Sequence, residues 1–241
     1  CRTIDAEKLC RGIQKVADVH PAMKCSIRTD ENGDTFMYPK DDREVEIERY
    51  SGTEEEYEAF FQNFAKPFDL EKGPLYRFAI FETETHLYLT IDFHHIISDG
   101  TSIAVFAQEL NRVMGEEEPL GEGYTQYDLA VDEERARQQE GYDKAREYYD
   151  SVFSGVSGCT VPDRDNYEEA ESLGFYRRYA EKLTPGRVED FCRKRKISPN
   201  VFFLSVMGYV LGKYAGSEEA CFTTIYNGRS DGRTADTMGM L

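Results

Sequence analysis

The residues best suited to chemistry are two adjacent histidines, His94 and His95, followed by Asp99 and Gly100. A neutral imidazole is the side chain best matched to proton transfer near neutral pH. Two of the four histidines of the chain lie here, in one of its most apolar stretches. Neighbouring side chains of a strand point to opposite faces, so we expect one histidine to pack inside and the other to open into a cleft.

Asp99 admits three interpretations. It could cap the following helix through its side-chain oxygen, pair with a buried arginine, or act on the histidine directly. Capping or a structural ion pair is favoured over catalysis, because an amphipathic helix pattern begins immediately after it, at Thr101. Gly100 is expected to let the backbone turn tightly where a side chain would intrude.

The elements that must position these residues are a hairpin and a helix. Residues 75–82 and 86–93 predict two paired strands, and in the second strand the side chains from 87 to 93 alternate between two faces. Residues 101–114 predict a helix. Arg77 lies on the first of these strands. An arginine in a buried strand needs an anion, and Asp99 is one candidate, but a solvent-facing Arg77 is an equally weighted interpretation.

The patterns elsewhere predict a mixed domain followed by a second region. Before the hairpin we expect a helix over 5–19, strands over 24–29, 35–39 and 45–49, and a helix that begins near residue 53. After it come a helix or helix pair over 127–153 and an aperiodic boundary over 154–167. The second region predicts a strand over 174–183, helices over 185–196 and from 199, and a strand over 221–226. The apolar run 201–211 predicts a buried helix.

Five stretches together resemble the condensation domains of nonribosomal peptide synthetases. His94–Gly100 is similar to their HHxxxDG signature, and Pro67–Arg77 to their PFDL-x-x-GPL-x-R stretch. The stretch 19–24 resembles RHPALR, with Val19 and Lys24 in place of its arginines. The stretch 124–130 resembles YxDYA, with Gln126 where Asp is usual, and 227–229 with 238–241 resembles the start of a late GR…G motif. Order and spacing agree over essentially the whole chain.

This resemblance implies the α/β chloramphenicol-acetyltransferase-like fold, with α+β two-layer lobes and a mixed sheet flanked by helices. Relative to a complete condensation domain, we expect a near-complete first lobe over 1–160 and the start of the second lobe over 161–241, with both ends of the domain missing.

The implied reaction is amide-bond formation between a donor acyl or peptidyl thioester and an acceptor aminoacyl thioester. His95 would be the central residue, as a base or by orienting the amine. Asp99 would hold the loop through an ion pair, with Arg229 as the first candidate partner and Arg77 as the second. Gly100 would line the active-site turn, and His94 would be structural. No cofactor or metal would be bound directly. Donor and acceptor carrier domains would present the substrates on phosphopantetheine, beside neighbouring synthetase domains.

Three other functions remain open. An epimerization domain of the same fold would use the histidine to remove an α-proton, and an acyltransferase acting on acyl-coenzyme A would share the signature. A degenerate domain could instead serve as a platform that binds a carrier or another partner.

The composition limits the partners, the metal or disulfide sites and the cellular location that we expect. The 241 residues carry a formal net charge of −17, which disfavours nucleic acid as a partner. The six cysteines show no CxxC spacing and no clustering with histidine, so neither a zinc site nor a disulfide framework is predicted. No signal peptide or membrane-spanning run is apparent, and a cytoplasmic location is expected.

Overall fold

The computed structural model describes residues 5–39, 44–156, 158–160, 185–229 and 231–241. The chain divides into two compact units, Cys1–Asp143 with Asn227–Leu241, and Lys144–Tyr226. The predicted strand over 174–183 and most of the predicted boundary over 154–167 lie outside the described residues. The division into family lobes near residue 160 therefore stays a prediction.

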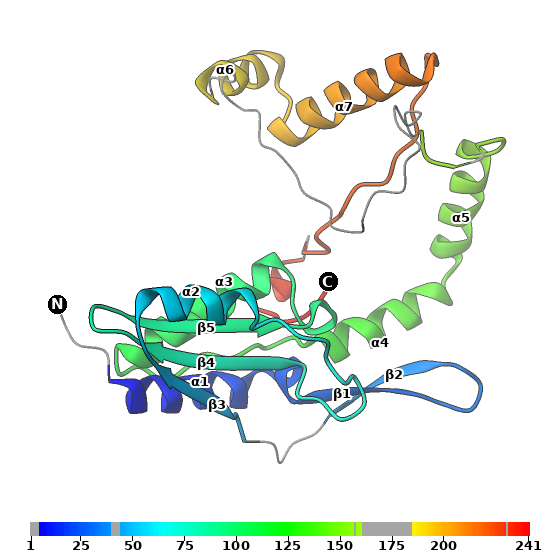
Figure 1. The fold of residues 1–241 in the computed structure, drawn as a ribbon. Coiled ribbons are helices and arrows are strands. Elements are labelled where there is room, and N and C mark those ends of the chain that lie inside the picture. Colours follow the sequence, from blue (N-terminus) through cyan, green and yellow to red (C-terminus); the bar gives the residue numbers. More distant parts are fainter. Residues whose placement is uncertain (1–4, 40–43, 157, 161–184, 230) are drawn as a thin grey trace, which may run out of the picture. The chain divides into compact units, whose positions relative to one another are not determined.

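The first unit contains the predicted hairpin and helices (Figure 1). In chain order its elements are α1 (Ala6–Val19), the 3-10 turn η1 (Pro21–Lys24), β1 (Cys25–Thr29), β2 (Thr35–Pro39), β3 (Ile47–Ser51), α2 (Glu54–Gln62), β4 (Tyr76–Glu82), β5 (Leu87–Phe93), the 3-10 turn η2 (His95–Ile97), α3 (Gly100–Met114), α4 (Gln126–Arg137) and the 3-10 turn η3 (Gly232–Thr234). Helix α5 (Glu140–Val152) crosses from the first unit into the second.

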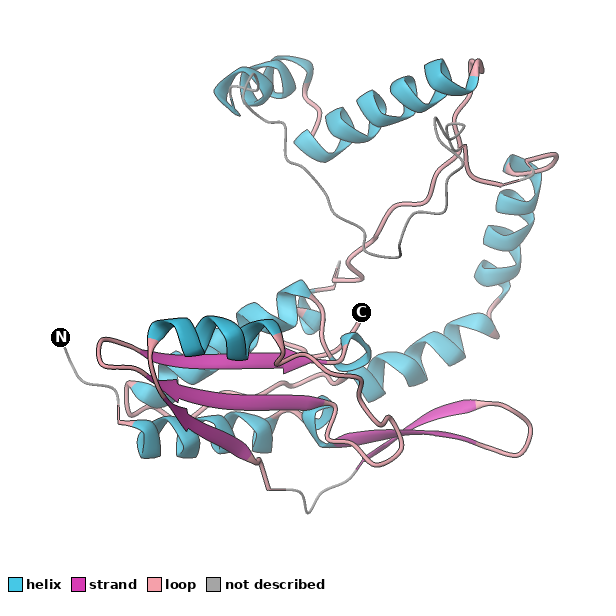
Figure 2. Cartoon of the chain, viewed as in Figure 1, coloured by secondary structure: helices cyan, strands magenta, loops and turns pink. Residues whose placement is uncertain are grey.

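The sheet of this unit is mixed, as expected (Figure 2). Strand β4 lies in the centre, parallel to β3 and antiparallel to β5. Strands β1 and β2 form a separate antiparallel hairpin, whose turn contains Gly33 at φ +88°. A positive φ is costly for other residues, which explains the Asn-Gly turn.

Helices cover both faces of the three-stranded sheet. On one face α1 and α3 pack together and against the sheet, where the ring of Phe106 stacks on Phe78 with centroids 5.5 Å apart. A Cβ added at Gly12 of α1 would lie 3.2 Å from Leu110 of α3, so the small residue permits this close helix contact. On the other face α2 packs through aromatic rings, including Tyr57 stacked on Tyr88. The β5–α3 connection thus starts from a rigid core.

The described part of the second unit holds helices α6 (Pro185–Arg195) and α7 (Pro199–Ala215). The prediction that 201–211 is buried is wrong, since Val201, Phe203 and Tyr209 are 48%, 49% and 67% exposed. Helix α7 contacts α6 and the segment after it, which cannot cover an apolar surface that runs round the whole helix.

The predicted strand over 221–226 is also wrong. Cys221 exchanges hydrogen bonds with Thr160, but no ladder continues from there among the described residues. A β-rich composition needs a neighbouring strand before it forms regular structure, so composition alone was insufficient.

Candidate active site

The two histidines lie in a short turn directly after the strand, whose end at residue 93 was predicted. Strand β5 ends at Phe93, and the backbone N–H of His94 donates to Leu75 O at 2.8 Å. The side chain of His94 then caps the following turn, because its Nδ1 accepts from Ile96 N at 3.1 Å. A nitrogen that accepts this bond carries no proton, so the proton of neutral His94 is on Nε2.

His95 differs from its neighbour in exposure and in bonding. It is the first residue of η2 and is exposed, whereas His94 is partly buried with the ring of Phe68 edge-on, 5.8 Å away between centroids. Within the described chain the ring of His95 takes part in no hydrogen bond or ion pair. Its imidazole is therefore free to act on a ligand, while the turn beneath it is held by His94.

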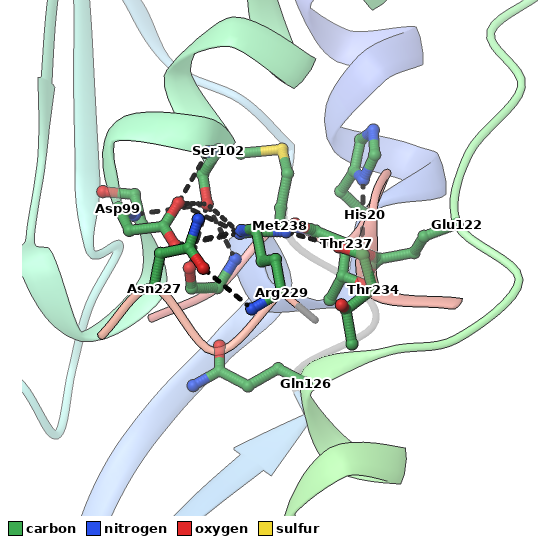
Figure 3. A network of polar contacts seen from close by, with 12 residues as sticks. His20, Asp99, Ser102, Glu122, Gln126, Asn227, Arg229, Thr234, Thr237 and Met238 are labelled. Atoms are coloured by element: carbon green, nitrogen blue, oxygen red, sulfur yellow. Dashed lines mark hydrogen bonds and ion pairs between the residues drawn. The ribbon is translucent and has the colours of Figure 1, made fainter. Parts of the chain in front are cut away.

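Asp99 forms the ion pair expected with Arg229 (Figure 3). Nη2 of Arg229 lies 3.0 Å from both carboxylate oxygens and Nε lies 3.2 Å from Oδ2. The side chains are only 15% and 5% exposed. Burial alone would raise the pKa of Asp99, but hydrogen bonds from Ser102 and Arg229 outweigh it and lower that pKa.

Asp99 also caps α3, so both favoured interpretations apply. Its Oδ1 accepts from Ser102 N at 2.7 Å, and Ser102 Oγ accepts from Asp99 N at 3.2 Å, which completes a capping box. The carboxylate therefore joins the start of the helix to Arg229, a residue 130 positions later in the chain.

Ser102 is a hub that sequence reasoning missed. Its fully buried Oγ lies 2.9 Å from both Asp99 Oδ1 and Gly239 O, and it accepts from Gly239 N at 3.0 Å. Arg229 in turn donates through Nη1 to Thr234 O at 2.6 Å and Thr237 O at 2.8 Å. Segment 227–241 is thereby fixed against the start of α3.

Gln126, at the first position of α4, connects this segment to the histidine turn. Its Nε2 donates to Ile96 O at 3.3 Å, one residue after His95. A Cβ added at Gly239, which has φ +156°, would lie 2.5 Å from Gln126 Oε1. The side chain of Gln126 thus packs directly on a glycine that leaves room for it.

The structure does not support a steric need for Gly100. A Cβ built there would meet no described atom within 4 Å, and its φ is not in the left-handed region. Gly100 is exposed at the start of α3, so its small size leaves open space beside the turn instead of relieving a contact within the protein.

Arg77 pairs with Asp92 and not with Asp99. Its Nη1 donates to Oδ2 of Asp92, which lies directly opposite Arg77 on the neighbouring strand β5. The guanidinium carbon of Arg77 lies 3.9 Å from the centre of the Phe68 ring. Tyr76 and Phe78 of β4 point into the α1/α3 core, so Arg77 points to the opposite face and away from α3. Arg77, the second candidate partner of Asp99, is therefore not its partner.

Among the described residues, no group of three or more histidine, cysteine or carboxylate side chains is arranged to hold a metal ion. The described cysteines are free thiols. None of the described helices combines the length and the apolar character that crossing a bilayer requires.

The family model for the condensation domain matches residues 2–241. The chain belongs to the condensation-domain family. Surfactin synthase subunit 1 of Bacillus subtilis (strain 168) is 27% identical over 244 residues, which cover 99% of this chain but 7% of that protein. The stretch that matches this chain is therefore a small part of that much longer synthetase.

Solved condensation domains share the fold. The condensation domain from Monacolin K polyketide synthase MokA superposes with a TM-score of 0.81 at 18% identity, covering 99% of this chain and 58% of that one. The epimerization domain from the third module of tyrocidine synthetase B gives a TM-score of 0.71 at 16% identity, covering 98% and 58%. The chloramphenicol-acetyltransferase-like fold is thus confirmed, and this chain spans 58% of the length of both structures.

Proposed function

We propose that this condensation domain forms an amide bond between a donor acyl or peptidyl thioester and an acceptor aminoacyl thioester. The observation that carries the proposal is the contrast within the histidine turn. His94, Asp99 and Ser102 are all engaged by protein groups, whereas the His95 ring is exposed and without a partner in the described chain. A free imidazole on a well-held turn is what a proton-transferring or amine-orienting group requires.

His95 would act on the amine of the acceptor. As the nitrogen attacks the thioester carbonyl, the imidazole either takes its proton or orients it and stabilises the developing charge. General-base catalysis contributes roughly two to four orders of magnitude. Holding two thioesters together contributes about 7–11 kcal/mol more through effective molarity. Gly100 lies five residues after His95, and no described atom lies within 4 Å of a Cβ built there, so Gly100 itself does not block a substrate.

The remaining site residues have supporting roles in this proposal. Asp99 and Arg229 fix the start of α3 beneath the turn, and His94 fixes the turn itself. Arg77 is more remote, since it joins β4 to β5 through Asp92 and steadies Phe68, which lies against His94.

The substrates would arrive on phosphopantetheine arms of donor and acceptor carrier domains, with neighbouring synthetase domains in the same assembly and the cytoplasm as the compartment. The low share of surfactin synthase subunit 1 that this chain covers, 7%, supports the presence of neighbouring synthetase domains. No directly bound cofactor is part of the proposal.

The test uses the full-length polypeptide that contains this domain, together with two loaded carrier proteins. Formation of the dipeptidyl carrier is followed by intact mass for wild type and His95→Ala. We expect transfer in the wild type and its loss in a folded His95→Ala variant. Transfer that persists in the variant would reduce His95 to a minor positioning role.

Epimerization is the second candidate, supported by the shared fold with a tyrocidine synthetase epimerization domain. It would exchange the α-proton of a single carrier-bound aminoacyl group and needs no second carrier. Incubation of one loaded carrier in deuterated water separates the two reactions, because only epimerization incorporates deuterium at the α-carbon and inverts it. Activity with free acyl-coenzyme A, or binding of a partner without any turnover, would favour the other two alternatives.

A further inference from the structure

A second pair of titratable side chains is buried in the first unit and has no part in the proposed reaction. His20, which follows α1, has an exposed fraction of zero, and the side chain of Glu122, in the loop between α3 and α4, is 1% exposed. Nδ1 of His20 lies 3.7 Å from Oε2 of Glu122 (Figure 3). Buried charges in proteins are paired, so two such groups at ion-pair distance need an explanation.

The pair is incompletely satisfied by the rest of the protein. Within the described chain neither ring nitrogen of His20 has a hydrogen-bond partner, and neither does Glu122 Oε1. The other oxygen of Glu122 accepts the backbone N–H of Met238 at 2.6 Å. Each side chain is therefore the nearest titratable neighbour that the structure gives the other, and Glu122 also has one short hydrogen bond to the backbone of segment 227–241.

That bond leads directly to the candidate active site. Met238 is fully buried, and the next residue, Gly239, hydrogen-bonds through both its N–H and its carbonyl to Ser102 Oγ. Ser102 contacts Asp99 at 2.9 Å. The carboxylate of Glu122 is therefore one peptide unit away from the hub that holds the capping aspartate.

We propose that His20 and Glu122 are positioning residues, a buried histidine–glutamate pair that holds Met238 and Gly239 on the start of α3. The pair acts on the reaction through Ser102 and the turn of His95, and only its activity readout rests on the proposed function. Glu122 is the critical member of the pair, because its side chain, unlike that of His20, accepts a hydrogen bond from segment 227–241.

The first test measures the positions of the backbone without any assay of turnover. Glu122→Gln keeps the size and the acceptor oxygen but removes the charge. Glu133→Gln on α4 is the matched control, since that glutamate is exposed. We expect peptides that contain Ser102 and Gly239 to exchange amide hydrogens about tenfold faster in Glu122→Gln, with the β4–β5 hairpin unchanged. Exchange indistinguishable from Glu133→Gln would overturn the proposal.

The second test uses the full-length polypeptide with loaded carriers and adds His20→Gln. Each single variant is expected to lower kcat about tenfold with little change in KM, and the double variant to lose no more than either single one, because each removes the same pair. Losses that multiply would show that the two residues act independently and would overturn the pairing. If His20→Gln does not fold, the exchange result for Glu122→Gln decides alone. A wild type without transfer would refute the proposed reaction but leave the exchange result valid.

Discussion

Removing the charge of Asp99 while keeping its cap should destabilise the first unit strongly. In Asp99→Asn the amide oxygen can still accept from Ser102 N, and asparagine is as good an N-cap as aspartate. What is lost is the charge opposite Arg229, whose side chain is only 5% exposed. The variant therefore isolates the ion pair from the cap.

The expected magnitude follows from the burial of the pair. Removing one partner of a buried ion pair costs about 3–5 kcal/mol. The low end applies here, because Arg229 keeps its bonds to Thr234 O and Thr237 O and because Asp99 is 15% exposed. We expect a loss of about 3 kcal/mol for Asp99→Asn, and about 1 kcal/mol more for Asp99→Ala, which also loses the cap.

Urea unfolding followed by far-UV circular dichroism measures the effect, since the chain has no tryptophan. The matched control is Asp18→Asn, whose carboxylate is 49% exposed and pairs with Lys24 at 2.7 Å. A surface pair contributes about 0–1 kcal/mol. If Asp99→Asn costs no more than Asp18→Asn, or if Asp99→Ala loses activity at unchanged stability, the structural role assigned to Asp99 is refuted.

The same pair makes a pH prediction. The pKa of Asp99 is lowered in the folded state, so its contribution is complete above the unfolded-state value of about 3.9 and is lost as the pH falls through the lowered folded-state value. The stability difference between wild type and Asp99→Asn should accordingly shrink in acid. A difference that persists below both values would mean that the charge is not its source.

Three further predictions concern other contacts. His94→Asn should retain the bond from Ile96 N and melt close to wild type, whereas His94→Ala should lose about 1 kcal/mol in urea unfolding; equal losses would refute the cap. Hydrogen bonds from Thr83, Tyr88, Thr85 and His86 lower the pKa of Glu54 to about 2, so an NMR titration of its carboxylate should show a midpoint there, and these bonds should weaken only as the pH falls through that value. Gly239→Ala should lower the stability by about 1–3 kcal/mol in thermal melting, because the added Cβ would overlap the side chain of Gln126. The double variant Gly239→Ala/Gln126→Ala should recover part of that loss. No recovery would mean that the contact between Gln126 and Gly239 does not limit stability.

Local patterns predicted the fold around the site well, because they act over a few residues. Two strand patterns separated by a short turn, the second alternating over 87–93, predicted the β4–β5 hairpin, and an aspartate before an amphipathic run predicted the cap of α3. The partner of Arg77 could also have been found. An antiparallel hairpin over these ranges places Arg77 directly opposite Asp92, and opposite charges across a strand pair attract.

The long-range parts of the site left no local signal. Ser102 and Gly239 are 137 positions apart, and neither residue type indicates that the other is its partner. His20 follows α1 and Glu122 follows α3, and these two helices are brought together by tertiary packing and not by a local pattern. The pairing of Asp99 with Arg229 was expected from a family resemblance, not from spacing. The burial of α7 was predicted wrongly, because an apolar composition favours burial but does not show that other elements lie against the helix.

In the site, the residues that hold the turn are distinct from the histidine that is proposed to react. The groups around the turn are bonded to one another: His94 to Ile96, Asp99 to Ser102 and Arg229, and Ser102 to Gly239. Satisfied polar groups in a low-dielectric interior hold one geometry, because each loses more by moving than it would in water. A reactive imidazole must instead keep its nitrogens available until the substrate arrives. A turn held by these bonds, on which the exposed ring of His95 has no partner among the described residues, meets both requirements of the proposed reaction.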